Sequence, residues 1–216
     1  MKRKEMPLIE RIITSESDIG IWKITETAQE LLSAFPEDED MVSLFNGRGS
    51  EELKLERLSV RVLLHCLLPD RMVKIIYDNN GKPFLKGSSG KISITHTKGY
   101  SAIMVSATVE PGIDIERRKH RAAGIASRYL SKKELSAYSN GIDDDSATIR
   151  WSAKESVYKI FGAPVVDFRK TMEIDTFDVI SDSELKMSVM TANEFNAQIV
   201  VNFRVFDDFL LTWAEK

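Results

Sequence analysis

A single cysteine, Cys66, is present among the 216 residues of the sequence, and no long apolar run occurs. One thiol cannot form an internal disulfide, so we expect a buried, inert Cys66 in a reducing compartment. No stretch approaches the roughly 20 apolar residues that cross a bilayer, and no apolar core follows the basic residues near the N-terminus. These absences argue against a disulfide scaffold, and we expect a cytoplasmic protein with no signal peptide and no membrane anchor.

The sequence also lacks an excess of charge of one sign. Its 30 basic and 33 acidic side chains give a net charge of −3, whereas nucleic-acid-binding proteins are usually basic. No G-x-x-x-x-G-K-[ST] phosphate loop occurs, which argues against the phosphotransferases built on that motif. The content of 43% hydrophobic and 29% charged residues is typical of a globular protein with one large domain or two small ones.

The first half of the sequence predicts a mixture of helices and strands. Its long helix has a leucine-rich apolar stripe that ends before Pro69, and Asn79-Asn80-Gly81 marks a turn between strands. The predicted elements are a strand at 19–25, a helix at 27–35, a loop at 37–50, a helix at 51–68, and strands at 73–77, 92–95 and 101–105.

The second half predicts a similar mixture. Ser131 and Glu134 form a capping-box pattern, and Gly162 lies where a helix C-cap is expected. The predicted elements are a strand at 112–116, helices at 122–129 and 131–138, a loop at 141–145, a helix at 146–161, and strands at 172–180, 185–191, 197–206 and 209–213.

Both halves therefore share an order of strand, short helices, loop, long helix and strands. Internal duplication would produce this order, and so would coincidence in a mixed chain. We expect an N-terminal half at 1–109 and a C-terminal half at 110–216.

Asp114 and Glu116 are two residues apart on the predicted strand at 112–116. Alternate side chains of a strand point to one face, so both carboxylates should face the same way, with Ile113 and Ile115 directed into the core. Two carboxylates aimed at one point repel each other unless a cation lies between them. The pattern predicts either a metal site or a strand with one face in water.

The second long helix contains the segment Trp151-Ser152-Ala153-Lys154-Glu155-Ser156-Val157-Tyr158-Lys159. Glu155 and Lys159 are four residues apart, which suits a surface ion pair worth about 0.3–0.5 kcal/mol. Apolar residues among these charges indicate instead that part of the charged face lies near packed surface. An acid and two lysines there would hold a metal ion and a phosphate together, because Mg²⁺ prefers carboxylates, phosphate oxygens and water.

Three residues of the first half are candidate phosphate contacts. These are His96 between two threonines, Lys82 in the rigid turn Gly81-Lys82-Pro83, and Arg61 on the first long helix. Each of them also suits a solvent-exposed position. The basic run Arg117-Arg118-Lys119-His120-Arg121 suits a solvated face, an acidic partner or a nucleic acid, and the acidic net charge disfavours the last.

The order of these segments resembles the 4′-phosphopantetheinyl transferase superfamily, in particular its larger, surfactin-synthetase-activating (Sfp-like) class. The resemblance covers residues 53–159. The segments that carry it are Gly81-Lys82-Pro83, Ser93-Ile94-Thr95-His96-Thr97, Gly112-Ile113-Asp114-Ile115-Glu116 and the helical segment 151–159. It implies an α+β fold that is a pseudo-dimer of two similar α/β halves, each a small sheet packed with a long helix.

The resemblance also implies an activity and its partners. The protein would be a monomeric holo-[acyl-carrier-protein] synthase that uses Mg²⁺ and takes coenzyme A as co-substrate. It would transfer the 4′-phosphopantetheine group to a serine of an apo acyl, peptidyl or aryl carrier protein and release 3′,5′-ADP. The alternative is a non-catalytic module that binds coenzyme A or a carrier protein through a decayed site.

The site residues follow from the same resemblance. Asp114, Glu116 and Glu155 match the family's magnesium ligands, and Glu155 is the candidate base for the carrier serine. The remaining matched residues would contact coenzyme A and are Arg61, Lys82, Thr95, His96, Lys154 and Lys159, of which the two helix lysines would also assist catalysis. One departure is that Gly162-Ala163-Pro164-Val165-Val166 replaces a glycine-rich segment common in the family.

Overall fold

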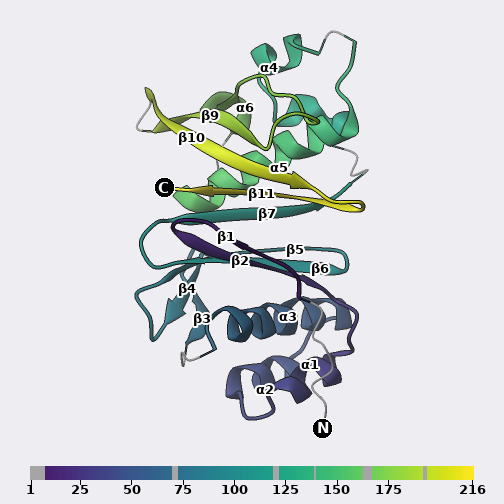
Figure 1. The fold of residues 1–216 in the computed structure, drawn as a ribbon, viewed down its shortest axis with the longest axis vertical. Helices are drawn as coiled ribbons and strands as arrows, with labels where there is room; N and C mark the ends of the chain where they lie inside the picture. The colour runs from purple at the N-terminus through teal and green to yellow at the C-terminus, as the bar shows by residue number, and fades with distance from the viewer. Residues whose placement is uncertain (1–7, 70–72, 119–121, 139, 163–166, 192–193) are drawn as a thin grey trace. The chain divides into compact units, whose positions relative to one another are not determined.

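The computed structural model describes residues 8–69, 73–118, 122–138, 140–162, 167–191 and 194–216. The chain is mixed α+β and divides into two compact units, unit 1 (Met1–Val109) and unit 2 (Glu110–Lys216) (Figure 1). Within the described ranges, no helix has the length and apolar character required to cross a membrane.

Unit 1 contains an antiparallel sheet of four strands in the order β1-β2-β6-β5, together with a separate β3–β4 hairpin. The hairpin turn includes Gly81 at φ 83°, a conformation that glycine adopts without steric cost. The helices are α1 (Ala28–Ala34), α2 (Glu39–Asn46) and α3 (Glu51–Leu67), and the strands are β1 (Leu8–Ile13), β2 (Ser17–Lys23), β3 (Lys74–Tyr77), β4 (Pro83–Lys86), β5 (Lys91–Thr97) and β6 (Tyr100–Ser106).

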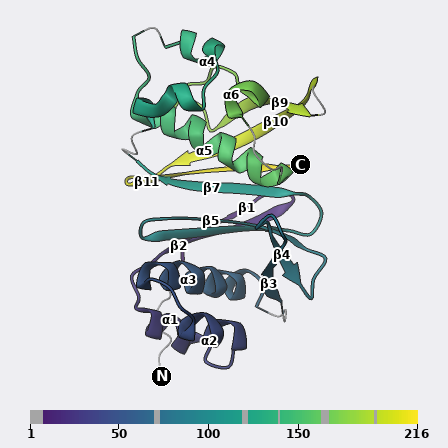
Figure 2. The same ribbon diagram turned by 180° about the vertical axis from the view of Figure 1, so that it is seen from behind.

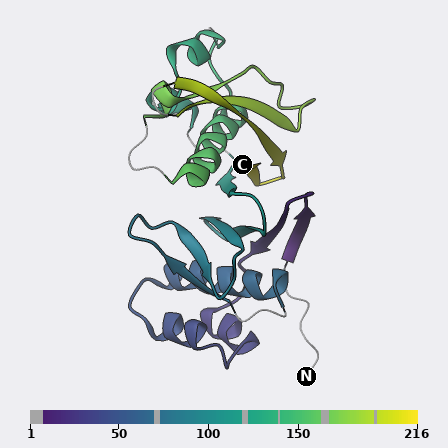
Figure 3. The same cartoon turned by 90° about the vertical axis from the view of Figure 1, so that its left-hand side faces the viewer.

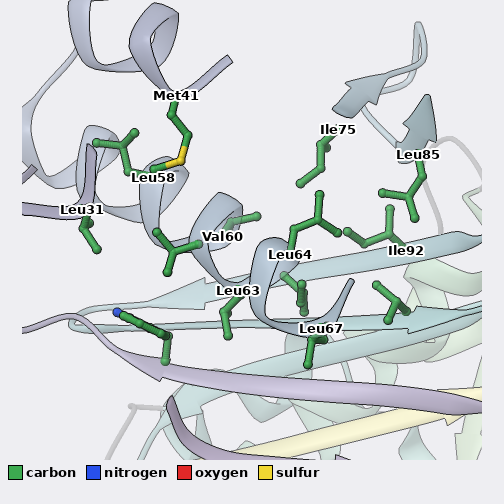
Figure 4. Close-up of a cluster of buried hydrophobic side chains, with 14 of the residues drawn as sticks. Leu31, Met41, Leu58, Val60, Leu63, Leu64, Leu67, Ile75, Leu85 and Ile92 are labelled. Atoms are coloured by element: carbon green, nitrogen blue, oxygen red, sulfur yellow. The ribbon is translucent and has the colours of Figure 1, made fainter. Parts of the chain in front are cut away.

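The core of unit 1 is organised around α3. This helix lies between the four-stranded sheet and the pair α1 and α2, as the front and back views show (Figures 1 and 2). Figure 4 shows the α3 side chains Leu58, Leu63 and Leu67 directed into the cluster that surrounds the helix. Met41 from α2 and Ile75 from β3 join the same cluster, so helices and hairpin share one hydrophobic core.

Unit 2 contains a five-stranded antiparallel sheet in the order β7-β11-β10-β9-β8. The strands are β7 (Pro111–Arg117), β8 (Met172–Ile174), β9 (Glu184–Thr191), β10 (Glu194–Val205) and β11 (Phe209–Glu215). The helices are the 3-10 helix η1 (Ala123–Arg128), α4 (Lys132–Ser136), α5 (Asp144–Phe161) and α6 (Phe168–Thr171).

Helix α5 packs on one face of this sheet, against β7, β11 and β10. Figure 3 shows the green helix running beside the yellow-green strands. Asp143 caps its N-terminus by accepting the backbone N–H of Ser146, and Gly162 ends it in the left-handed conformation at φ 58°. The buried face of α5 includes Ala153 and Val157, and it completes the core of unit 2.

The two units share one feature of strand order. In each unit, the last strand lies between two others. One neighbour is the strand that comes before the long helix, and the other is the strand directly before the last one in sequence. The pairs are β2–β6 and β6–β5 in unit 1, and β7–β11 and β11–β10 in unit 2.

Most predicted elements are confirmed, including both long helices, the capping box at Ser131 and the C-cap at Gly162. The predicted loop at 37–50 is wrong, because Asp38 caps α2 and Met41 is buried in the core. The segment at 122–129 forms a 3-10 helix, and the helix predicted from 146 begins two residues earlier, at Asp144.

The predicted strand at 172–180 is also wrong beyond Ile174. A turn follows, in which the side chain of Asp178 accepts hydrogen bonds from the backbone N–H groups of Ile180 and Ser181. Aspartate competes with sheet pairing by such local bonds. Three short elements were missed by the sequence patterns, namely β1, β4 and α6.

Candidate functional site: a buried acid–lysine cluster on β7 and α5

The face of β7 that carries Gly112, Asp114 and Glu116 lies under helix α5. A Cβ added to Gly112 would overlap the backbone oxygen of Ser156 and approach Cγ1 of Ile160 to 2.7 Å. Asp114 is 6% exposed and bonded to residues of α5. The carboxylates therefore do not belong to a solvent-facing strand, which rules out that interpretation of the sequence.

Both oxygens of Asp114 accept hydrogen bonds from α5. Nζ of Lys159 donates to Oδ1 at 2.8 Å and to the backbone oxygen of Ile113 at 2.9 Å, while Oγ of Ser152 donates to Oδ2 at 2.8 Å. Charge-assisted bonds of this kind hold a carboxylate in one orientation. Lys159 is thus an ion-pair partner of Asp114, and an ion pair between Lys159 and Glu155 is absent from the described residues.

Glu155 lies on α5, one turn before Lys159, and its side chain is half-buried. Burial, together with the charges of Asp114 and Glu116, raises the pKa of Glu155 to about 7, and the charge of Lys159 opposes this rise. Among the residues that the structure describes, no group forms a hydrogen bond or ion pair with the Glu155 carboxylate. Three acids and one lysine are therefore gathered between β7 and α5.

Glu116 is held by the indole of Trp151, whose Nε1 donates to Oε1 at 2.9 Å. The Trp151 ring packs against Tyr129 and Phe168, with ring centroids at 5.3 and 5.9 Å. No hydrogen bond between Trp151 and Glu116 was predicted from the sequence. The sequence feature that could have indicated a role in the site is the position of Trp151 one turn before Glu155 on the same helix.

These carboxylates have the donor chemistry of a magnesium site, because hard divalent cations take carboxylate oxygens and favour a region of negative charge. A closed site is not formed in the structure: across the described ranges, no three His, Cys, Asp or Glu side chains converge tightly enough to hold a metal ion. The assignment of Asp114, Glu116 and Glu155 as metal ligands stays a prediction.

Lys154 requires a correction. Its side chain is 0% exposed, and Nζ donates to Glu134 Oε2 at 2.8 Å and to the backbone oxygens of Tyr129 and Met172 at 2.9 Å each. Burial lowers the pKa of Lys154, while the charge of Glu134 and its hydrogen bond oppose that effect. All three donors of the ammonium group are used, so Lys154 does not contact coenzyme A in this arrangement.

Arg61 lies on α3 and pairs with an acid of α2. In unit 1, its Nε donates to Asp40 Oδ2 at 2.8 Å, and the side chain is 7% exposed. The contact with Asp40 of α2 uses one of the five N–H donors of the guanidinium. The contact of Arg61 with a phosphate of coenzyme A stays a prediction.

The other predicted ligand contacts of unit 1 lie on two hairpins. His96 is on β5, and its Nδ1 is 3.3 Å from Oε1 of Glu56 on α3. Thr95 is buried beside it, and Lys82 is half-buried next to the turn at Gly81. Their contacts with coenzyme A stay predictions.

Two residues of the basic run have partners within unit 2. Arg117 pairs with Asp208 at 3.4 Å, and Arg118 pairs with Asp145 at 2.6 Å. Arg118 also donates to the backbone oxygen of Phe206 at 3.2 Å. Residues 119–121 of the run lie outside the described residues. The first two arginines therefore join segments of unit 2, which reduces the charge that they offer to a partner.

A mixed α+β unit with carboxylates and a lysine gathered between a strand and a helix has the donor set of an enzyme that acts on phosphate groups with a divalent cation. Residues 110–214 match the family model of the 4′-phosphopantetheinyl transferase superfamily (ACPS), a segment that spans nearly all of unit 2. No curated protein matches the chain. The match supports phosphopantetheine transfer as the general activity.

Proposed function

We propose that the chain transfers the 4′-phosphopantetheine group of coenzyme A to a serine of an apo carrier protein and releases 3′,5′-ADP, with Mg²⁺ as cofactor. The observation that carries the proposal is the cluster of Asp114, Glu155 and Lys159, which lies inside the segment that matches the superfamily model.

Asp114, Glu116 and Glu155 would hold Mg²⁺ through carboxylate oxygens. Bound there, the ion would neutralise charge on the phosphate oxygens of coenzyme A. The three acids lie near one lysine, and two of them are restrained by hydrogen bonds. Trp151 restrains Glu116, and Ser152 restrains Asp114. Side chains held in this way need little reorganisation when a cation binds.

The side chains of the cluster also have roles in the transfer step. The Oγ atom of the carrier serine attacks the phosphorus nearer to pantetheine, the bond from that phosphorus to the bridging oxygen breaks, and 3′,5′-ADP leaves. Glu155 accepts the serine proton at its carboxylate. Lys159 holds Asp114 with one donor and the backbone oxygen of Ile113 with a second, and we propose that the third donor contacts a phosphate oxygen.

Four residues of unit 1 are further candidate contacts for coenzyme A. Lys82, Thr95 and His96 would contact its nucleotide and phosphates, and Arg61 would contact a phosphate through guanidinium donors other than Nε, which bonds Asp40. The shared strand order of the two units supports an internal duplication, as in the pseudo-dimer of the larger Sfp-like class. We propose a monomer whose protein partner is an acyl, peptidyl or aryl carrier.

Intact-protein mass spectrometry tests the proposal directly. Apo carriers of the fatty-acid, polyketide and nonribosomal-peptide types are incubated separately with the protein, coenzyme A and Mg²⁺. We expect at least one carrier to gain one phosphopantetheine mass, and we expect the gain to vanish with EDTA or with Asp114→Ala.

Asp182→Ala is the matched control, because this exposed aspartate lies in the turn after β8, outside the cluster. Its activity should equal that of the parent protein. No mass gain on any carrier, combined with coenzyme A binding in calorimetry, would favour the non-catalytic binding module instead.

A further inference from the structure

Three buried hydroxyl groups lie behind Asp114. Ser152, Ser156 and Thr212 are each 0% exposed. Burial of a hydroxyl group costs free energy unless the group is hydrogen-bonded, and alanine or valine would fill the same space at no such cost. The mechanism proposed above uses the Ser152 hydroxyl to restrain Asp114 and assigns no role to Ser156 or Thr212.

Sheet register and helix period bring the three hydroxyls to one place. Thr212 on β11 is the direct cross-strand partner of Asp114 on β7. Ser152 and Ser156 are one turn apart on α5, so they lie on the same face of the helix. The absence of a side chain at Gly112 lets the backbone of β7 approach Ser156 closely.

The contacts form a continuous chain of hydrogen bonds. Oγ of Ser152 donates to Asp114 Oδ2 at 2.8 Å, and Oγ1 of Thr212 is 2.9 Å from Oγ of Ser152. Oγ of Ser156 is 2.6 Å from Oγ1 of Thr212, its shortest contact, and also lies 3.0 Å and 3.1 Å from the backbone oxygens of Ser152 and Thr212.

Proton counting gives this chain a direction. Each hydroxyl has one proton, and that of Ser152 is committed to Asp114, so the Ser152 oxygen is left to accept a bond from Thr212. The Thr212 oxygen can in turn accept from Ser156. The Ser152 and Thr212 hydroxyls then point toward the negative charge of Asp114, and bonds in such a chain strengthen one another. The Ser156 hydroxyl joins this chain when it donates to Thr212 instead of to the backbone oxygen of Ser152 or Thr212.

We propose that Ser152 and Thr212 are positioning residues that orient Asp114 as a metal ligand, with Ser156 supporting Thr212. Ser152 bonds one carboxylate oxygen and Lys159 bonds the other, so the carboxylate plane cannot rotate freely, and Asp114 would be presented to a cation in one orientation. This inference rests on the proposed function, since it requires that Asp114 binds Mg²⁺.

Mn²⁺ affinity measured by electron paramagnetic resonance tests the inference without turnover. Loss of an outer partner of a metal ligand weakens metal binding by about 10–100-fold. We expect Ser152→Ala to raise the Mn²⁺ Kd within this range, and Thr212→Val to raise it by about tenfold, at the lower end. Thr212→Ser keeps the hydroxyl and should bind Mn²⁺ as the parent protein does.

Thr148→Val is the matched control. Thr148 is also buried on α5, one turn before Ser152, but its hydroxyl donates to the backbone oxygen of Asp144 at 2.6 Å and not toward Asp114. This variant should bind Mn²⁺ normally. If it weakens Mn²⁺ binding as much as Thr212→Val does, the effect is one of packing and the inference is wrong.

A double variant tests whether Thr212 acts through Ser152. If it does, Ser152→Ala with Thr212→Val should bind Mn²⁺ no more weakly than Ser152→Ala alone, because residues of one network are not additive. Additive losses, or unchanged binding in Thr212→Val, would overturn the inference. Circular dichroism confirms that each variant is folded.

Asp114→Asn separates the failure of this inference from that of the proposed function. If Asp114→Asn loses Mn²⁺ binding while Ser152→Ala and Thr212→Val retain it, the metal site stands and only the positioning role fails. If the parent protein and Asp114→Asn bind Mn²⁺ equally, or neither binds it, the metal site itself is wrong, and the positioning role fails with it.

Discussion

At the scale of single residues, Gly112 determines how closely strand β7 approaches helix α5. There is no space for a side chain at Gly112, because a Cβ there would overlap the backbone oxygen of Ser156. Two residues further along the same face is Asp114, which bonds to Ser152 and Lys159 of that helix. Gly112 therefore has a role in packing that does not depend on ligand binding.

Gly112→Ala should lower the free energy of unfolding by about 1–3 kcal/mol, the usual range for a side chain forced into a packed interior. The physical reason is that the strand must move away from α5 to relieve the overlap. Urea denaturation followed by circular dichroism measures the change.

Gly124→Ala provides the comparison, because a Cβ at Gly124 meets no atom within 4 Å. Its stability should change by no more than about 0.5 kcal/mol. Equal stability of the two alanine variants would contradict the close approach seen in the structure.

At the scale of secondary-structure elements, Lys154 ties α5 to two neighbours. Its ammonium group bonds to Glu134 on α4, to the backbone oxygen of Tyr129 beside that helix, and to the first residue of β8, Met172. Glu134 in turn accepts the backbone N–H of Ser131 in the capping box and that of Ile174 on β8. One buried ion pair thus joins three elements of unit 2.

Lys154→Met should lower the free energy of unfolding by about 3 kcal/mol, the lower end of the usual range for breaking a buried ion pair, since Arg150 still lies 3.8 Å from the buried Glu134 carboxylate. Lys154→Met combined with Glu134→Gln should not recover this loss, because it leaves the buried guanidinium of Arg150 without a carboxylate partner, although glutamine can still form the capping box. Urea denaturation of both variants measures the difference.

The same variant tests the correction made for Lys154. A folded Lys154→Met protein should bind coenzyme A as tightly as the parent protein in calorimetry. Normal stability combined with lost coenzyme A binding would restore a direct ligand contact for this lysine.

At the scale of the whole molecule, stability depends on carboxylates that are paired in the folded state. In unit 1, Oδ2 of Asp38 is 2.7 Å from Nε2 of His65, and Oδ1 accepts the backbone N–H groups of Asp40 and Met41. Burial raises the pKa of Asp38, but these hydrogen bonds outweigh burial and leave the pKa below its ordinary value. A depressed pKa stabilises the fold above the unfolded pKa, about 3.9, and that stabilisation is lost as pH falls through the folded value.

Asp38→Asn should therefore lower the free energy of unfolding at pH 7 by roughly 1 kcal/mol, a value reduced by solvent screening. Asparagine remains a good N-cap residue, so helix α2 should persist. At an acid pH below the folded pKa, where the parent carboxylate is protonated in both states, the two proteins should differ little. Urea denaturation at both pH values measures this, and an equal loss at pH 7 and in acid would contradict the assignment.

The sequence by itself determined the elements of the site and their local chemistry. The alternation in Gly112-Ile113-Asp114-Ile115-Glu116 predicted strand β7 with two carboxylates on one face, and the apolar period with its C-cap at Gly162 predicted α5. These features follow from backbone geometry and neighbours within a few residues, which a sequence displays directly. The mixed α+β class follows from the same patterns.

Only the tertiary structure decided the partner of each charged side chain. Lys154 and Lys159 look equivalent in sequence, but one is buried against Glu134 and the other bonds Asp114. Arg61 is similarly held by Asp40 of another helix. Asp114 and Thr212 are 98 positions apart in sequence (212 minus 114), and only the pairing of β7 with β11 makes them neighbours. Such choices depend on sheet register and on which helix faces are covered, and no local pattern contains that information.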